Sequence, residues 1–141
     1  MTQAEIIEFI NKYPVFSLAT ASDNIPHVRG MMVAVADSRG LIFSTSRQKD
    51  VFAQLCSNPK IEMCFLSNDK STQIRIEATA VETNDLELKK EIVEKFVFLK
   101  PMIEAAGYDV LAVFKATNAR AVIWTMETME QTKEYIPLTD L

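Results

Sequence analysis

The sequence predicts a mainly β protein with peripheral helices, an α+β fold whose largely antiparallel sheet curls into a barrel or packs as a sandwich. Seven segments have the composition of strands, most neighbours among them are joined by short turns, and residues 72–82 alternate apolar and polar side chains. Short connections favour antiparallel pairing. So many strands in a chain of 141 residues are expected to curl or stack rather than remain one flat sheet.

Capping residues and apolar spacing predict the first elements. Thr2 and Glu5 have the spacing of a capping box, and an apolar stripe at helical period continues to Tyr13. Pro14 ends this helix. The next elements are a strand over 15–21, a turn at 22–24 and a strand over 26–36.

A turn composition at residues 37–40, Asp-Ser-Arg-Gly, predicts a hairpin between the strand over 26–36 and a strand over 41–45. Residues 31–36 are apolar throughout, so we expect that part of its strand to be buried on both faces. A short helix over 48–57 follows, and it ends at an Asn-Pro pair because proline has no backbone N–H to donate.

The second half of the chain adds two helices and four strands. Asn84 and Glu87 have capping-box spacing and begin a helix that continues through residue 98. Pro101 begins another short helix, which Gly107 ends. The other segments are strands over 60–66, 72–82, 108–115 and 119–126, a tight turn at Thr117-Asn118, and a polar tail over 127–141 that we expect on the surface or over a partner.

Composition limits the class of protein. With 48% hydrophobic residues, residues 1–141 are expected to form a single domain with a sizeable core. The net charge of −4 argues against broad nucleic-acid binding. No apolar run approaches the ~20 residues of a membrane span, and the N-terminus has no signal-peptide pattern. Cys56 and Cys64 have neither CxxC nor zinc-site spacing, so we expect reduced thiols and a cytoplasmic location. Because the sequence has no apolar run long enough to span a membrane, we also expect no membrane partner.

Residues 26–55 contain a candidate anion site. Arg29 lies on one predicted strand, the hydroxyl residues 44–46 end the next, and Arg47 and Lys49 come just before a predicted helix. Helix N-termini present free N–H groups and partial positive charge, which suit phosphate. The stretch therefore predicts a phosphate cradle, although capping hydroxyls and surface cations give the same pattern.

Several other site classes are excluded by the residues the chain lacks. Only three glycines are present, so neither a GxGxxG motif nor a P-loop can be built, and no GxSxG elbow occurs. The carboxylates are scattered and resemble solvated faces, and His27 is the only histidine. An enzyme with this sequence needs a cofactor to carry the chemistry, and a phosphate-bearing cofactor fits the candidate cradle.

The motifs follow one another in a specific order. They are Arg29-Gly30-Met31-Met32-Val33, Gly40, Phe43-Ser44-Thr45, Lys49, Asn58-Pro59 and Gln73-Ile74-Arg75-Ile76-Glu77. This order of an arginine-led apolar strand, a glycine turn, a hydroxyl pair and a basic residue resembles the pyridoxamine 5′-phosphate oxidase-related family of FMN-binding split barrels. The resemblance covers most of residues 14–126.

The resemblance implies a six-stranded antiparallel split barrel, a homodimer and two FMN molecules at the subunit interface. It also implies that the 29–34 strand lies along the flavin, that Ser44 and Thr45 contact the ribityl–phosphate end, and that Lys49 pairs with the phosphate. Gln73 would reach the isoalloxazine ring, and Trp124 would pack near it from the other subunit. The candidate cofactor-binding residues are Arg29, Gly30, Met31, Met32, Val33, Phe43, Ser44, Thr45, Lys49, Gln73 and Trp124.

The resemblance further implies a flavin oxidoreductase that transfers hydride or electrons between a donor such as NAD(P)H and an unknown small acceptor. Oxidases of pyridoxamine phosphate end in an arginine–histidine-rich segment, and this chain has neither residue type beyond Arg120, so we do not expect that activity. Two alternatives remain open. The protein is a non-catalytic carrier or sensor of a flavin, deazaflavin or haem, or it is a cofactor-free dimeric interaction module.

Overall fold

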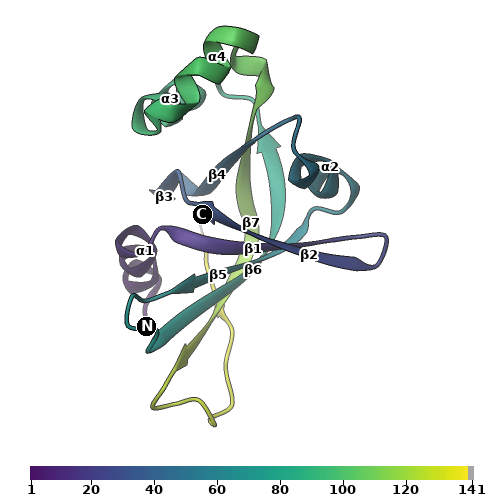
Figure 1. Ribbon diagram of the computed structural model, residues 1–141. Coiled ribbons are helices and arrows are strands. Elements are labelled where there is room, and N and C mark those ends of the chain that lie inside the picture. The colour runs from purple at the N-terminus through teal and green to yellow at the C-terminus, as the bar shows by residue number, and fades with distance from the viewer. Residues whose placement is uncertain (140–141) are drawn as a thin grey trace.

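The computed structural model describes residues 1–139, in which one curled sheet of eight strands carries helices on its outside (Figure 1). Every strand pairing is antiparallel, in the order β2-β1-β5-β6-β7-β4-β3, with β8 added to β7. The strands are β1 (Val15–Ser22), β2 (Ile25–Met32), β3 (Val35–Asp37), β4 (Gly40–Ser46), β5 (Lys60–Leu66), β6 (Thr72–Thr83), β7 (Leu111–Thr125) and β8 (Ile136–Pro137). The helices are α1 (Gln3–Lys12), α2 (Asp50–Ser57), α3 (Leu86–Lys95) and α4 (Lys100–Ala106), with 3₁₀ turns η1 (Val97–Leu99) and η2 (Tyr108–Val110).

The predicted fold class, a mainly antiparallel split barrel with peripheral helices, is confirmed. The sheet is not closed, because β2 and β3 form the two ends of its pairing order. The strand count differs from the six of the expected barrel. One predicted strand is divided in two, two predicted strands are joined into one, and the tail adds β8.

The predicted strand over 26–36 is the one that is divided. Its first part, β2, pairs with β1, whereas its last part, β3, pairs with β4, so the predicted hairpin is correct only for β3. Between them the N–H of Val33 donates to Pro14 O at 2.9 Å, and the N–H of Ala34 donates to Ile42 O at 2.8 Å. The two N–H groups at the break are thus hydrogen-bonded to different parts of the backbone, so the apolar run is divided between two strands without leaving a buried donor unpaired.

The predicted turn at Thr117-Asn118 is wrong, because β7 continues through it. The register between β6 and β7 shifts between Glu77 and Thr79, and Asn118 has a φ of 49°. Asparagine adopts this left-handed conformation in turns and in bulges alike, so its presence does not distinguish the two. The predicted strand start at Tyr108 is also wrong, because the 3₁₀ turn η2 comes before Leu111.

We expect Asn118→Val to lower the free energy of unfolding by about 1–2 kcal/mol, because a β-branched residue is strained at positive φ. Asn118→Gly should leave stability unchanged or slightly raised, since glycine adopts this conformation without strain. Urea unfolding followed by circular dichroism measures both. Equal stability of the valine variant and the wild type would show that the bulge is not held in the left-handed conformation.

The helix boundaries follow largely from capping residues. The predicted capping box of α1 is confirmed, since Thr2 Oγ1 accepts from the N–H of Glu5 at 3.2 Å and the Glu5 carboxylate accepts from the N–H of Thr2 at 2.7 Å. The predicted box of α3 is one residue early: Asp85, not Asn84, is the N-cap and accepts from the N–H of Leu88 at 3.1 Å. No helix within residues 1–139 has both the length and the apolar character needed to cross a bilayer.

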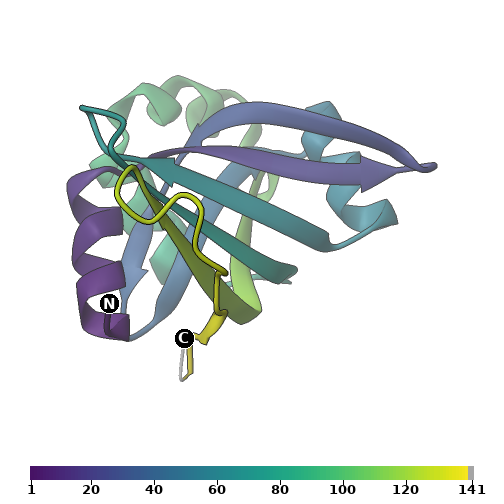
Figure 2. The ribbon, with the colours of Figure 1, turned by 90° about the horizontal axis from the view of Figure 1, so that it is seen from below.

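Two apolar cores position the site. The larger one fills the barrel between α1, α2 and the strands, and α1 and α2 lie on opposite sides of the molecule (Figure 2). The smaller one lies where α3 and α4 meet the β3–β4–β7 end of the sheet, beyond the main barrel (Figure 1). Helices α3 and α4 thus form a separate layer that leaves the edge of β2 uncovered.

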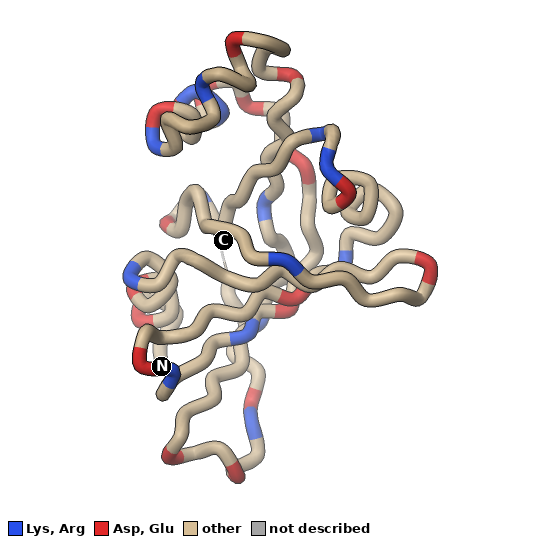
Figure 3. Tube along the Cα trace, viewed as in Figure 1, with Lys and Arg blue, Asp and Glu red and all other residues tan. Residues whose placement is uncertain are grey.

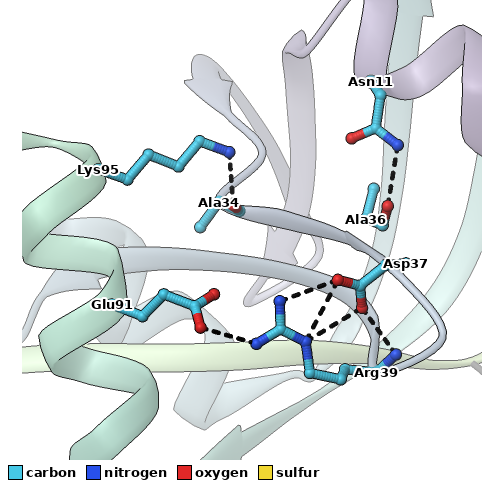
Figure 4. A network of polar contacts seen from close by, with 7 residues as sticks. All are labelled: Asn11, Ala34, Ala36, Asp37, Arg39, Glu91 and Lys95. Carbon is cyan, nitrogen blue, oxygen red and sulfur yellow. Dashed lines mark hydrogen bonds and ion pairs between the residues drawn. The ribbon is translucent and has the colours of Figure 1, made fainter.

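Polar contacts attach α1 and α3 to β3 and to the residues on either side of it (Figure 4). Arg39 bonds Asp37 and Glu91 of α3, each at 2.9 Å, and these hydrogen bonds raise the pKa of Arg39. Lys95 donates to the carbonyl of Ala34 at 2.8 Å, and Asn11 of α1 donates to that of Ala36 at 2.9 Å. The position of α3 relative to the sheet is therefore set by side-chain to backbone bonds as well as by apolar packing.

The polar tail lies on the surface of its own chain as far as residue 139, and residues 140–141 lie outside the described part. Leu138 is buried, and the Tyr135 hydroxyl donates to Glu77 at 2.8 Å. The guanidinium of Arg120 lies 4.0 Å from the centre of the Tyr135 ring. The tail therefore covers part of β6 and β7.

Candidate functional site

A pocket of about 270 Å³ opens between β2, β4, the start of α2 and the η1–α4 segment. It brings together six of the sequence-predicted residues, which come from two strands and one helix start. The lining residues are Gly30, Met31, Met32, Ser44, Thr45, Ser46, Lys49, Phe96, Phe98, Leu99, Met102 and Leu111.

One end of the pocket is polar. Ser44 and Ser46 come from the end of β4, and Lys49 is the N-cap residue of α2. No side chain caps this helix: the Ser46 hydroxyl accepts from the N–H of Gln48 at 3.2 Å instead. The N–H of Phe52 donates to the carbonyl of Lys49 at 3.1 Å, so the amides of Asp50 and Val51 are those left for another acceptor, beside an ammonium group and two hydroxyls. This donor set suits a phosphate.

The other end of the pocket is apolar. Phe96, Phe98 and Leu99 come from the segment that joins α3 to α4, and Met102 comes from α4. The rings of Phe96 and Phe98 are 5.8 Å apart, and Phe98 remains 74% exposed. A large aromatic side chain left in solvent beside a pocket indicates a surface for an apolar or aromatic ligand.

Arg29 is not among the residues that line the pocket. Its guanidinium donates to the carbonyl of Leu18 at 3.3 Å, to Thr20 Oγ1 at 2.9 Å and to Gln54 Oε1 of α2. Burial lowers the pKa of Arg29. The structure therefore places this predicted phosphate ligand in a network within its own chain.

Arg47, a second candidate phosphate cation, is also not among the residues that line the pocket. It forms an ion pair with Glu82 and donates from Nε to the carbonyl of Asp109 at 2.6 Å. Its guanidinium lies 5.0 Å from the centre of the Phe52 ring, and the hydrogen bond to Glu82 raises the pKa of Arg47. Among residues 1–139, Lys49 is thus the cation that lines the pocket.

Two further predicted residues have side chains in the main core rather than in the pocket. Val33 is 3% exposed and Phe43 is fully buried. The Phe43 ring lies 6.0 Å from that of Phe16 and 5.8 Å from that of Phe114. That Val33 and Phe43 contact a cofactor stays a prediction. In the structure their side chains pack in the main core.

Gln73 and Trp124 form a second group of predicted residues. They are partners across β6 and β7, whereas Ser44 pairs with Val113 near the other end of β7. At about 3.3 Å per residue, Trp124 lies roughly 36 Å along a regular strand from Val113. One chain therefore holds the predicted residues as two separate groups.

The apolar end of the pocket was not predicted as part of the site. Phe96 was assigned to the apolar face of a helix expected to continue through residue 98. The helix instead ends at Lys95, and the following turn directs Phe98 toward solvent. The available signal was a pair of aromatic residues, Phe96 and Phe98, just before the helix start at Pro101.

Charge over the rest of the surface is mixed. Basic and acidic residues are interspersed along the chain, and cations appear at the start of α2 and along α3 (Figure 3). Of these positions, the start of α2 is the one that adjoins the pocket, through Lys49.

Comparisons with known proteins agree with the fold. The family model described as pyridoxamine 5′-phosphate oxidase matches residues 2–123. A protein named pyridoxine/pyridoxamine 5′-phosphate oxidase, from Anaeromyxobacter dehalogenans (strain 2CP-C), is 35% identical over 72 residues, which are 50% of this chain and 36% of that protein. The matched region is thus well under half of that relative.

Solved structures resemble nearly the whole chain. A NimC/NimA family protein from Clostridium acetobutylicum has a TM-score of 0.79 at 25% identity, covering 96% of this chain and 93% of that one. A haem-binding protein from Mycobacterium smegmatis has a TM-score of 0.73 at 13% identity, covering 99% of this chain and 60% of that one. The second likeness shows a shared fold.

Proposed function

The chain belongs to the pyridoxamine 5′-phosphate oxidase family, and from that premise we propose that it binds FMN and acts as a flavin oxidoreductase. It would pass hydride or electrons from a donor such as NAD(P)H to a small acceptor. The observation that carries this proposal is the two-ended pocket, with phosphate donors at the start of α2 and an aromatic wall opposite β2. Bound FMN supplies the redox chemistry, so no acid–base dyad is needed.

The residues present fit such a cofactor. Lys49 and the uncapped amides of α2 would hold the phosphate, and Ser44 and Ser46 would bond the ribityl–phosphate end. Met31 packs against the main core, whereas Met32 on β2 and the facing aromatic side chains would pack on the ring and keep water from one side of it. The role of the chain is then to hold and orient reactants, which is what hydride transfer requires.

We propose that the protein is a homodimer. At about 270 Å³, the pocket is small for a cofactor of this size, and it opens beside the uncovered edge strand β2. Exposed apolar residues lie on the nearby outer sheet face, among them Val15 (60% exposed) and Val28 (71% exposed). A second copy on that face would bring the partner subunit's Gln73 and Trp124 toward the pocket and account for the separation of the two groups.

Haem is a weaker candidate than flavin for this pocket. Haem iron in proteins is held by His, Cys, Met or Tyr. Of these types the described lining contains only Met31, Met32 and Met102, and the single histidine, His27, lies outside it. Haem carries no phosphate, so the polar end of the pocket at the start of α2 would have no phosphate to bind.

Titration of the purified protein with FMN tests the proposal. We expect saturable quenching of flavin fluorescence at one FMN per chain, and weaker binding of riboflavin, which lacks the phosphate. NAD(P)H oxidation by the FMN-loaded protein in the presence of an added acceptor would support an oxidoreductase, whereas binding without turnover would support a carrier. A Soret band after haem addition, or indifference to every flavin, would contradict the FMN proposal.

A further inference from the structure

The outer face of β2, β1, β5, β6 and β7 presents three rows of side chains, each of which crosses all five strands. Register partners in an antiparallel sheet, and every second residue along a strand, point to the same face. The middle row follows from consecutive pairings and consists of Gly30, Ser17, Cys64, Arg75 and Val122. Strand β5 is the middle strand of these five.

No helix covers this outer face within residues 1–139. The alternate residues of the same strands fill the main core, and α1 and α2 contribute side chains to that core as well. Helices α3 and α4 pack on the smaller core, and Figure 2 shows them (green) behind β1, β5 and β6. Tyr135 of the tail lies against one corner, at Arg120. The rest of the face is left for solvent or for another molecule.

The exposed side chains of this face are apolar or paired with one another. Large apolar side chains lie along one outer row and at the β2 edge, and they are Val15, Val28, Met32 and Leu66. Arg75 lies 3.7 Å from Glu62, and Arg120 lies 2.7 Å from Glu77. These four charges cancel, so the face can lie against a second copy of itself without net like-charge repulsion.

The row that contains the predicted flavin contacts fixes how a second copy would lie. It runs from Met32 at the β2 edge through Val15, Leu66 and Gln73 to Trp124 on β7. Met32 lines the pocket, whereas Trp124 is at the far end of the row. A two-fold axis between two facing sheets exchanges the ends of this row only when it runs along the strand midway between them, which is β5.

We propose that two copies pack through this face about a two-fold axis along β5. This rests on the proposed function, because the axis follows from joining Met32 and the partner subunit's Trp124 in one site. Strand β5 then faces its own copy, β1 faces β6 of the other copy, and β2 faces β7. Leu66, on β5, faces Leu66 of the partner subunit. The two pockets lie at opposite edges of the interface, and each copy completes the pocket of the other.

A charge exchange at Leu66 tests this axis, because a residue on a two-fold axis meets its own copy. Leu66 is 39% exposed in the single chain, so a polar substitution is compatible with folding. We expect Leu66→Lys and Leu66→Asp each to raise the dimer dissociation constant by roughly a hundredfold, since like charges face each other. An equal mixture of the two variants should form dimers again, with one chain of each kind. Sedimentation velocity measures all three samples.

Val15 and Leu86 supply the controls. Val15→Lys and Val15→Asp should each weaken the dimer, but their mixture should show no rescue, because Val15 faces the partner subunit's Gln73 rather than itself. Leu86 is an exposed leucine at the start of α3, away from the face, so Leu86→Lys and Leu86→Asp should remain dimers. A monomeric wild type, Leu66 variants that stay dimeric, or Leu66 variants that dissociate without rescue would each overturn the axis.

The sedimentation experiment needs no FMN, so it is independent of the proposed function. Rescue in the Leu66 mixture by a protein that ignores FMN would support the axis and contradict the flavin proposal. Tight FMN binding by Leu66 variants that remain dimeric would contradict the axis and leave the flavin proposal standing. If both proposals hold, FMN affinity should fall in each Leu66 variant alone and return in the mixture.

Discussion

Replacing Phe43 by alanine is expected to lower the free energy of unfolding by about 3–5 kcal/mol, the range typical of a buried phenylalanine. Phe43 is fully buried, and its ring packs against those of Phe16 and Phe114 at 6.0 and 5.8 Å. The aromatic cluster spans β1, β4 and β7, so the vacated volume cannot be filled by movement of one element. Chemical denaturation of the apo protein measures the change.

Phe98→Ala is the matched control for this experiment. It removes the same side chain from a site that is 74% exposed, so we expect a loss of less than about 1 kcal/mol. If the two variants were equally stable, Phe43 would not be a core residue. A large loss of FMN affinity in Phe43→Ala at unchanged stability would support the direct cofactor contact that the family resemblance implies.

Replacing Lys49 by alanine should weaken FMN binding by about 1–3 kcal/mol, which corresponds to roughly 5- to 150-fold in the dissociation constant. Lys49 is the cation that lines the pocket within residues 1–139, since Arg29 and Arg47 are bonded elsewhere. A charge-assisted bond to phosphate is about twice as strong as a neutral one. Fluorescence titration with FMN at fixed ionic strength measures the loss.

Riboflavin separates a lost phosphate contact from general damage to the pocket. Because riboflavin has no phosphate, its affinity should be nearly the same in Lys49→Ala and the wild type. Lys100→Ala, at an exposed residue of α4 outside the pocket lining, removes the same charge and should leave FMN affinity unchanged. Equal losses for FMN and riboflavin in Lys49→Ala would remove Lys49 from the phosphate site.

Local sequence signals predicted the elements with strong local causes. The Thr2–Glu5 capping box, the Asp23-Asn24 turn and the stop at Gly107 all appear in the structure. Each depends on residues within one turn of one another. The predicted boundaries are wrong where pairing with a distant strand determines the structure. Residues 26–36 form two strands because β2 pairs with β1, whereas β3 pairs with β4. Asn118 forms a bulge because β6 continues beside it.

In the candidate site, too, some features follow from the local sequence and others depend on how distant elements pack. Ser44, Thr45 and Lys49 were predicted from a strand end and a helix start, and the fold brings them together in one pocket with residues 30–32. Arg29 was placed in that group by its position in the sequence, whereas its hydrogen bonds to Thr20 and Gln54 depend on how α2 packs over β1. Side-chain direction at one residue is decided by partners that come from elsewhere in the chain.

By itself the sequence determined the fold class, the family and the segment that contains the phosphate donors, because periodicity, capping and motif order are local properties. Only the tertiary structure decided that Phe43 is core, that Phe98 stands exposed at the pocket and that Gln73 and Trp124 lie away from it. These outcomes depend on which surfaces the packed elements leave exposed, and burial is a property of the whole fold.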